Sequence, residues 1–229
     1  MEALWNGLTR IAKGAILAGF ALLLFAALVV TAEVLVRKAI PLGIEIYQWA
    51  VGIFGGDSKT AGESFRLFVR DRMQFSGSDE ISGYLFAVGT SWSLAHVLIT
   101  RGHVRIDALY GSFPPAMRGW LDLVALIFLA IFVGALVERS FDVSWTNLIE
   151  NNRSNTNLRI PLAWSQLPWM AGIVLFFVTI VVAILRVIAA LVRGDYSTVN
   201  AIAGASSQDE EIAGELAGLG IEMPHGGKK

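Results

Sequence analysis

Cysteine is absent from this chain of 229 residues, which excludes disulfide bonds, thiolate metal sites and thiol catalysis together. Charged side chains are scarce as well: they make up 16% of the residues, against about 25% in a typical soluble domain. The formal net charge is −1, so no basic field favours nucleic acid as a partner. These shortages argue against an ordinary soluble enzyme.

What the sequence does contain is apolar length. Hydrophobic residues make up 55% of the chain, and four long apolar runs occupy residues 14–36, 81–100, 119–137 and 167–192. Each run has about the 20 residues that a helix needs to cross a bilayer core. The sequence therefore predicts an all-α membrane protein with four transmembrane helices.

The first run has one alternative reading. Arg10 and Lys13 precede it, and Val30-Thr31-Ala32 is similar to a signal-peptidase site. However, the run is longer than the ~7–15 apolar residues of a signal-peptide core. We therefore expect an uncleaved membrane anchor, preceded by a polar lead over residues 1–13.

The connection 38–79 is predicted to contain short interfacial amphipathic helices. Residues 40–54 are apolar but too few to span, and Pro41 suits a first helical turn. Thr60 and Glu63 form a capping-box pattern that predicts the start of a second short helix. Two roles for that helix stay open: packing on the chain's own helices and contact with a partner.

Four spans place both termini on one side of the membrane. The tight loop from Arg101 to Arg118 holds three Arg and one Asp, and short basic loops favour the cytoplasm. We therefore expect cytoplasmic termini, a periplasmic connection 38–79, and a mostly disordered cytoplasmic tail over residues 194–229, which is rich in Gly, Ala, Ser and acidic residues.

Residues suited to chemistry are few. Asp122 and Arg186 lie near the ends of their runs, so no charge is expected at mid-depth, where coupled transporters usually place one. His96 and His103 are seven residues apart and are better explained as interfacial residues than as haem ligands. The sequence predicts no catalytic, cofactor-binding or metal-binding residue, and it disfavours transport by this chain alone.

The sharpest local pattern is His103-Val104-Arg105-Ile106-Asp107. At helical spacing His103 and Asp107 share a face, so the carboxylate can orient the imidazole, while Arg105 can reach a lipid phosphate. The alternative is a capped turn beside the membrane with no further role.

Several segments resemble those of one transporter family. Arg37 closes the first run, Asp79-Glu80 opens the second, and Gly89 lies within it. Arg101-Gly102 and the His103–Asp107 pattern follow, and Ile160-Pro161-Leu162-Ala163-Trp164 leads into the last run. Over residues 14–193 the chain resembles the small membrane subunit (the DctQ-type small permease) of TRAP, or tripartite ATP-independent periplasmic, transporters. The structural or interface residues that the resemblance selects are Arg37, Glu80, Gly89, Arg101, His103, Arg105, Asp107, Pro161 and Trp164.

The resemblance implies a non-catalytic scaffold subunit in the bacterial inner membrane. Its partners would be a large multi-spanning permease, a periplasmic substrate-binding protein and membrane lipids. The permease would take up an organic acid by symport with Na⁺, so that the ion binds the partner and this chain needs no cofactor.

Two other functions compete with this interpretation. One is a free-standing membrane scaffold or assembly protein with no transported substrate. The other is a subunit of a membrane redox enzyme, which a haem absorbance band would reveal.

Overall fold

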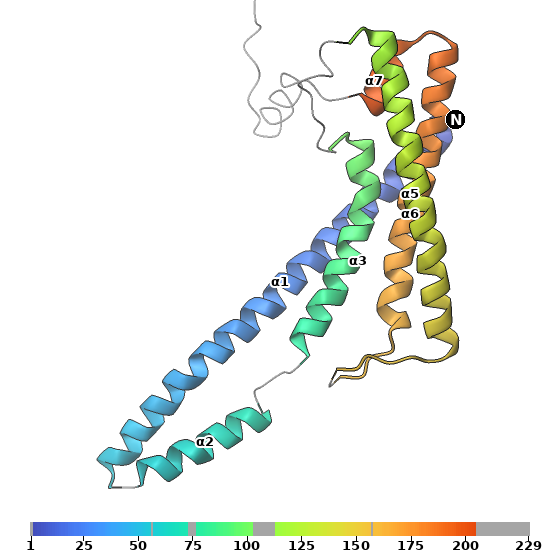
Figure 1. Ribbon diagram of the computed structural model, residues 1–229. Helices are drawn as coiled ribbons and strands as arrows, with labels where there is room; N and C mark the ends of the chain where they lie inside the picture. Colours follow the sequence, from blue (N-terminus) through green and yellow to red (C-terminus); the bar gives the residue numbers. More distant parts are fainter. Residues whose placement is uncertain (1, 56, 73–76, 103–112, 157, 205–229) are drawn as a thin grey trace, which may run out of the picture. The chain divides into compact units, whose positions relative to one another are not determined.

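The structure is a computed structural model that describes residues 2–55, 57–72, 77–102, 113–156 and 158–204 (Figure 1). Within these ranges the regular structure consists of helices, with no β-strand. The helices are α1 (Glu2–Ile53), α2 (Ser58–Arg72), α3 (Ser78–Ile99), α5 (Pro115–Ile149), α6 (Ala163–Val192) and α7 (Tyr196–Ala203). The predicted all-α class is confirmed.

Three of the described helices, α1, α5 and α6, are long and apolar enough to cross a membrane. The run 81–100, predicted as a further span, does form a helix, since α3 covers 22 residues there. Ser82, Thr90, Ser91 and Ser93 make α3 less apolar than the other three. A fourth span at α3 therefore stays an expectation.

Helix α1 corrects the prediction for residues 1–54. It is continuous over 52 residues and holds Pro41 in its interior, so the separate helix expected at 40–54 with Pro41 in its first turn is wrong. The expected polar lead 1–13 is likewise part of this helix from Glu2 onward. Proline removes one helical hydrogen bond and costs about 3 kcal/mol inside a helix. The rest of this long helix outweighs that single break.

Two boundaries of α5 and α6 also differ from the prediction: α5 ends later than expected, and α6 begins earlier. Helix α5 continues twelve residues beyond the expected end at 137, through the polar positions Arg139 and Asp142, which form an i,i+3 ion pair with N–O separation of 3.8 Å. Helix α6 starts at Ala163, so Pro168 lies inside it rather than at its opening. Polar residues on an exposed helix face were misread as a loop.

Helix α2 begins at Ser58 because Asp57, and not the predicted Thr60, caps it. The Asp57 carboxylate accepts hydrogen bonds from the Lys59 N–H at 3.1 Å and from the Thr60 hydroxyl at 2.6 Å. The Thr60 hydroxyl, followed by the Lys59 N–H, holds the pKa of Asp57 below its ordinary value. On its inner face α2 packs against α1, where the rings of Phe65 and Tyr47 stack with centroids 5.2 Å apart.

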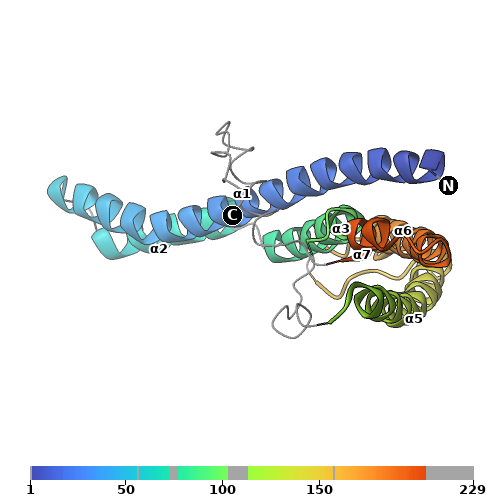
Figure 2. The same cartoon turned by 90° about the horizontal axis from the view of Figure 1, so that it is seen from above.

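The chain divides into two compact units, which we describe separately. The first comprises Met1–Ile11, Ala95–Ala135 and Leu175–Lys229; the second comprises Ala12–Leu94 and Leu136–Val174. Figures 1 and 2 show α5 and α6 side by side, and each unit holds one stretch of this pairing. In the first unit Gly134 lets the Phe177 ring approach, since a Cβ there would lie 3.3 Å from it. In the second, the Asn147 amide donates to the Gln166 side chain at 2.8 Å.

The second unit is organised by a close crossing of α1 and α3. A Cβ on Gly19 would lie 2.6 Å from the Gly89 carbonyl oxygen, and a Cβ on Gly89 would lie 2.8 Å from the Gly19 carbonyl oxygen. Small residues allow such approach of two backbones, which is a common source of helix association in membranes. Gly89, a residue selected by the family resemblance, is therefore a packing residue between these helices.

This crossing makes Gly89→Ala a sharp test of the α1–α3 contact. The added methyl group meets backbone, which cannot rotate away, so we expect a loss of about 1–3 kcal/mol of stability. Gly83→Ala is the matched control on the same helix, because nothing lies within 4 Å of its Cβ position. Thermal unfolding in detergent should show a lowered midpoint for Gly89→Ala alone; equal midpoints would refute the crossing.

Candidate functional site

The family signature begins at the end of α3, where Arg101 has an unusual backbone. Its φ of 58° lies in the left-handed region, which glycine normally occupies at the end of a helix. The Gly102 N–H bonds the Val97 carbonyl at 2.9 Å and the Arg101 N–H bonds the Leu98 carbonyl at 3.1 Å. This pattern is a Schellman motif, which fixes the direction in which the chain leaves α3.

An arginine in this position carries a local backbone cost, since a side chain in the left-handed region is disfavoured by about 1–2 kcal/mol. Its guanidinium reaches α7, where Nη1 donates to the Asn200 carbonyl at 3.2 Å. The end of α3 is thereby attached to α7 within the first unit. His103, Arg105 and Asp107 lie outside the described residues, so their predicted roles stay predictions.

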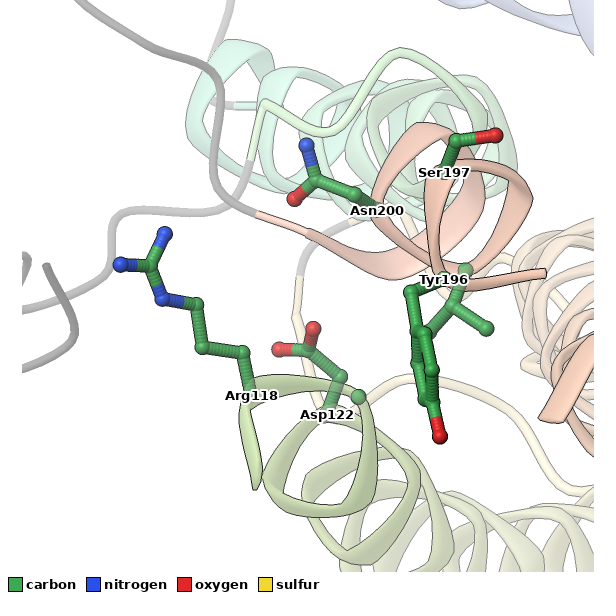
Figure 3. Close-up of a pocket in the computed structure, with 7 residues that line it drawn as sticks. Arg118, Asp122, Tyr196, Ser197 and Asn200 are labelled. Carbon is green, nitrogen blue, oxygen red and sulfur yellow. The ribbon is translucent and has the colours of Figure 1, made fainter. Parts of the chain in front are cut away.

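Beside this attachment α5 and α7 enclose a polar cavity of about 240 Å³ (Figure 3). Arg118 and Asp122 come from the first turns of α5, and Tyr196, Ser197 and Asn200 come from α7. The Arg118 side chain donates to the Phe113 carbonyl at 2.6 Å, and Asp122 is only 4% exposed. A buried carboxylate and a guanidinium thus line the same cavity. Such a lining is suited to binding a polar group or to holding α7 against α5.

Helix α7 owes its start to Asp195. The Asp195 carboxylate accepts hydrogen bonds from the Thr198 hydroxyl, from the Ser197 hydroxyl at 2.8 Å and from the Thr198 N–H at 3.1 Å. These bonds, that of the Thr198 hydroxyl first, lower the pKa of Asp195 to about 2. Val199 then anchors the helix, being 1% exposed.

The predicted disorder of residues 194–229 therefore needs correction at its beginning, where residues 196–203 are helical. Residues 205–229 lie outside the described part of the chain. The signal that sequence reasoning missed is Asp195 three residues before Thr198, which is an N-cap pattern.

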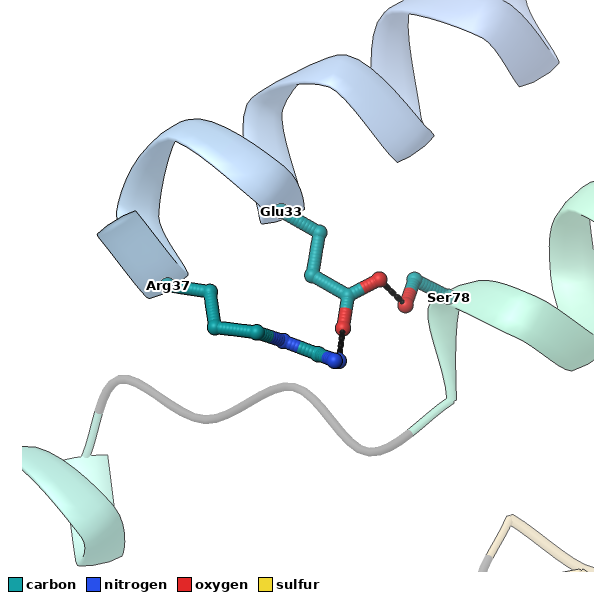
Figure 4. A network of polar contacts seen from close by, with 3 residues as sticks. All are labelled: Glu33, Arg37 and Ser78. Carbon is teal, nitrogen blue, oxygen red and sulfur yellow. Dashed lines mark hydrogen bonds and ion pairs between the residues drawn. The ribbon is translucent and has the colours of Figure 1, made fainter. Parts of the chain in front are cut away.

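In the second unit, the start of α3 is attached to α1 through Arg37, Glu33 and Ser78 (Figure 4). One oxygen of the Glu33 carboxylate pairs with the Arg37 guanidinium one turn away, and the other accepts the Ser78 hydroxyl. Ser78 is 2% exposed, so the pairing shields the first turn of α3. The residue selected as Arg37 therefore acts through Glu33.

The next residues of α3 hold the α5–α6 connection. Glu80, which precedes the predicted span, accepts hydrogen bonds from the Thr156 hydroxyl and from the Tyr84 hydroxyl at 2.7 Å. The Thr156 bond contributes most to a pKa of Glu80 below its ordinary value. Pro161 pairs with Arg153 in an isolated antiparallel bridge of the same connection. Trp164, at the start of α6, is 75% exposed, as suits an interfacial aromatic residue.

One further contact of α3 was not predicted. The Trp92 indole N–H donates to the Pro168 carbonyl on α6 at 2.8 Å. A Cβ on Gly172 would lie 2.4 Å from the Ser91 hydroxyl oxygen, so the two helices approach closely here. The partners are 76 residues apart in sequence, and a Trp within an apolar run gives no sign of its partner.

The described residues thus bring polar side chains together at helix–helix contacts. Among them no group of three or more His, Asp or Glu side chains could hold a metal ion. Three of these helices are long and apolar enough to cross a membrane, which is typical of a membrane protein.

Comparison with protein families identifies the class more closely. The family model of the DctQ component of tripartite ATP-independent periplasmic transporters matches residues 64–190. That range covers more than half of the chain and includes all of α3 and α5, and most of α2 and α6. The chain belongs to this family, and the predicted resemblance is confirmed. No curated protein and no solved structure gave a match.

The α3–α6 contact predicts that Trp92→Phe lowers stability by about 1 kcal/mol, because the ring remains but its hydrogen bond to Pro168 is lost. Trp164→Phe serves as the control, since its exposed ring should change stability by less than about 0.5 kcal/mol. Thermal unfolding of both variants in one detergent provides the comparison. A larger loss for Trp164→Phe would contradict the contact.

For α7 we expect Asp195→Ala to speed hydrogen exchange at the backbone of Val199 and Asn200, because the N-cap bonds are lost. Asp195→Asn should keep most of the protection, as Asn also caps well.

The same cap should depend on pH. Because the pKa of Asp195 in the folded protein lies below the ordinary 3.8, the carboxylate's stabilisation is present above about pH 4 and declines as pH falls through about 2. Exchange followed by mass spectrometry would test both; protection unaffected by Asp195→Ala would reject the cap.

Proposed function

We propose that this chain is the small, non-catalytic scaffold subunit of a TRAP-type secondary transporter. It would support a large permease that takes up an organic acid by symport with Na⁺ after delivery by a periplasmic binding protein. The observation that carries the proposal is the family match over residues 64–190. This range contains α3 and α5 and most of α6.

The distribution of charge in α6 favours the role of a scaffold subunit. Arg186 is the single ionisable residue in the 30 residues of α6, and it lies six residues before the helix end. Carriers generally place charges or broken helices at mid-depth, where substrate and ion bind. A helix such as α6, with one charge near its end, is suited to holding a partner that has such sites.

The length of α3 supports a four-span topology. Helix α3 has 22 residues and hence a length of about 33 Å, enough for a hydrocarbon core of about 30 Å. With α3 as a fourth span, the protein would cross the bacterial inner membrane four times, and the basic loop 101–118 favours cytoplasmic termini.

The decisive experiment is affinity purification of the tagged full-length protein from mild detergent, at native expression and with the neighbouring genes present. Mass spectrometry should identify a large multi-spanning permease in stoichiometric amount. We expect Asp107→Asn to weaken recovery of this partner, because the signature segment would lose its carboxylate charge, whereas Asp209→Asn in the tail should not.

Two results would redirect the function. Purification of the chain alone would favour the free-standing scaffold. A haem absorbance band in the purified sample would favour the redox subunit.

A further inference from the structure

A second cavity, of about 520 Å³, lies in the first unit where α6 ends, beside the first residues of α1 and the start of α7. Arg186 and Arg193 line it, with Ala189 and Ala190 between them. Arg186 lies in the last turns of α6 and Arg193 directly follows the helix, so the two arginines flank a floor of small side chains. This arrangement leaves room for a ligand between two positive charges.

The surroundings place this cavity at the level of lipid headgroups. Helix α6 is 30 residues long, so about 45 Å of helix exceeds the ~30 Å core and its ends reach the headgroup layer. The Arg186 guanidinium lies over the Trp5 ring, 4.5 Å from its centroid, a pairing of cation and aromatic ring that suits the interface. Val192, the last residue of α6, is 84% exposed.

Two acidic residues, Glu2 and Asp195, form the acidic wall of the same cavity. The capping bonds that lower the pKa of Asp195 to about 2 keep its carboxylate negative at neutral pH. Two arginines and two acidic residues therefore line one space, so the lining is balanced in charge rather than basic. A simple anion would meet repulsion from the acids, whereas a ligand that carries both signs would find a partner for each.

We propose that this cavity binds the headgroup of an amine-bearing glycerophospholipid from the surrounding leaflet. The phosphodiester would lie against Arg186 and Arg193, and the ammonium against Glu2 and Asp195. Guanidinium and phosphate form strong, directional hydrogen bonds, and the acyl chains would continue along the apolar end of α6. The site requires only that the chain lies in a membrane.

Native mass spectrometry of the full-length protein in detergent can test this. The probes are palmitoyl-oleoyl phosphatidylethanolamine, the matching phosphatidylglycerol, and inorganic phosphate. We expect one phosphatidylethanolamine per chain, bound in preference to phosphatidylglycerol. Arg186→Gln together with Arg193→Gln should weaken binding about tenfold or more, because two charge-assisted bonds are lost. Arg139→Gln, an exposed arginine in the second unit, is the control.

The acidic wall is tested by Glu2→Gln with Asp195→Asn, which removes both charges while Asn still caps α7. We expect the preference for phosphatidylethanolamine over phosphatidylglycerol to disappear while total lipid binding persists. This variant decides the matter even if the double arginine variant fails to fold.

Three outcomes would overturn the proposal. Phosphatidylglycerol could bind the wild-type protein as well as phosphatidylethanolamine. Lipid binding could survive unchanged in a folded double arginine variant. Inorganic phosphate could displace the lipid completely, which would make the cavity a site for free phosphate.

Discussion

A hydrocarbon solvent offers no hydrogen bonds, and this single constraint governs the whole chain. Every backbone N–H and C=O inside the membrane must be satisfied within its own segment, which leaves the helix as the available form for an open chain. Because lipid tails are as apolar as leucine, burying hydrophobic surface between such helices gains little. The helices must instead recognise each other by close backbone approach and by a few polar bonds.

Helix α3 shows how these contacts are assigned. Four of its residues attach it to other elements of the second unit. Ser78 bonds Glu33, Glu80 bonds the α5–α6 connection, Gly89 meets α1, and Trp92 bonds α6. The hydroxyls of Ser82, Thr90, Ser91 and Ser93, which lower the hydropathy of α3, instead bond carbonyls of the same helix.

The same physics explains what the sequence revealed. The apolar runs predicted all four long helices, because the thickness of a bilayer core sets the number of consecutive apolar residues that a spanning helix needs. Their ends were less readable. Pro41 and Pro168 were taken as helix starts, yet both lie inside helices, since one missing hydrogen bond costs less than the many that continue around it.

Contacts between distant segments were hidden for a different reason. Gly89 and Glu80 were selected through the family resemblance, but their partners Gly19 and Thr156 are 70 and 76 residues away. No local pattern encodes such pairs. Asp57 and Asp195, by contrast, are caps that act within three residues, and closer attention to spacing would have found them.

The unbroken course of α1 has a mechanical consequence. Its 52 residues form about 14 turns and extend about 78 Å, more than twice the thickness of the hydrocarbon core. No loop separates the segment clasped by α3 at Gly19 from the segment stacked on α2 at Tyr47. Both contacts therefore lie on one continuous helix, and a rotation of α1 at Gly19 would also displace the Tyr47 ring on which Phe65 stacks, with Pro41 as the one missing hydrogen bond between them.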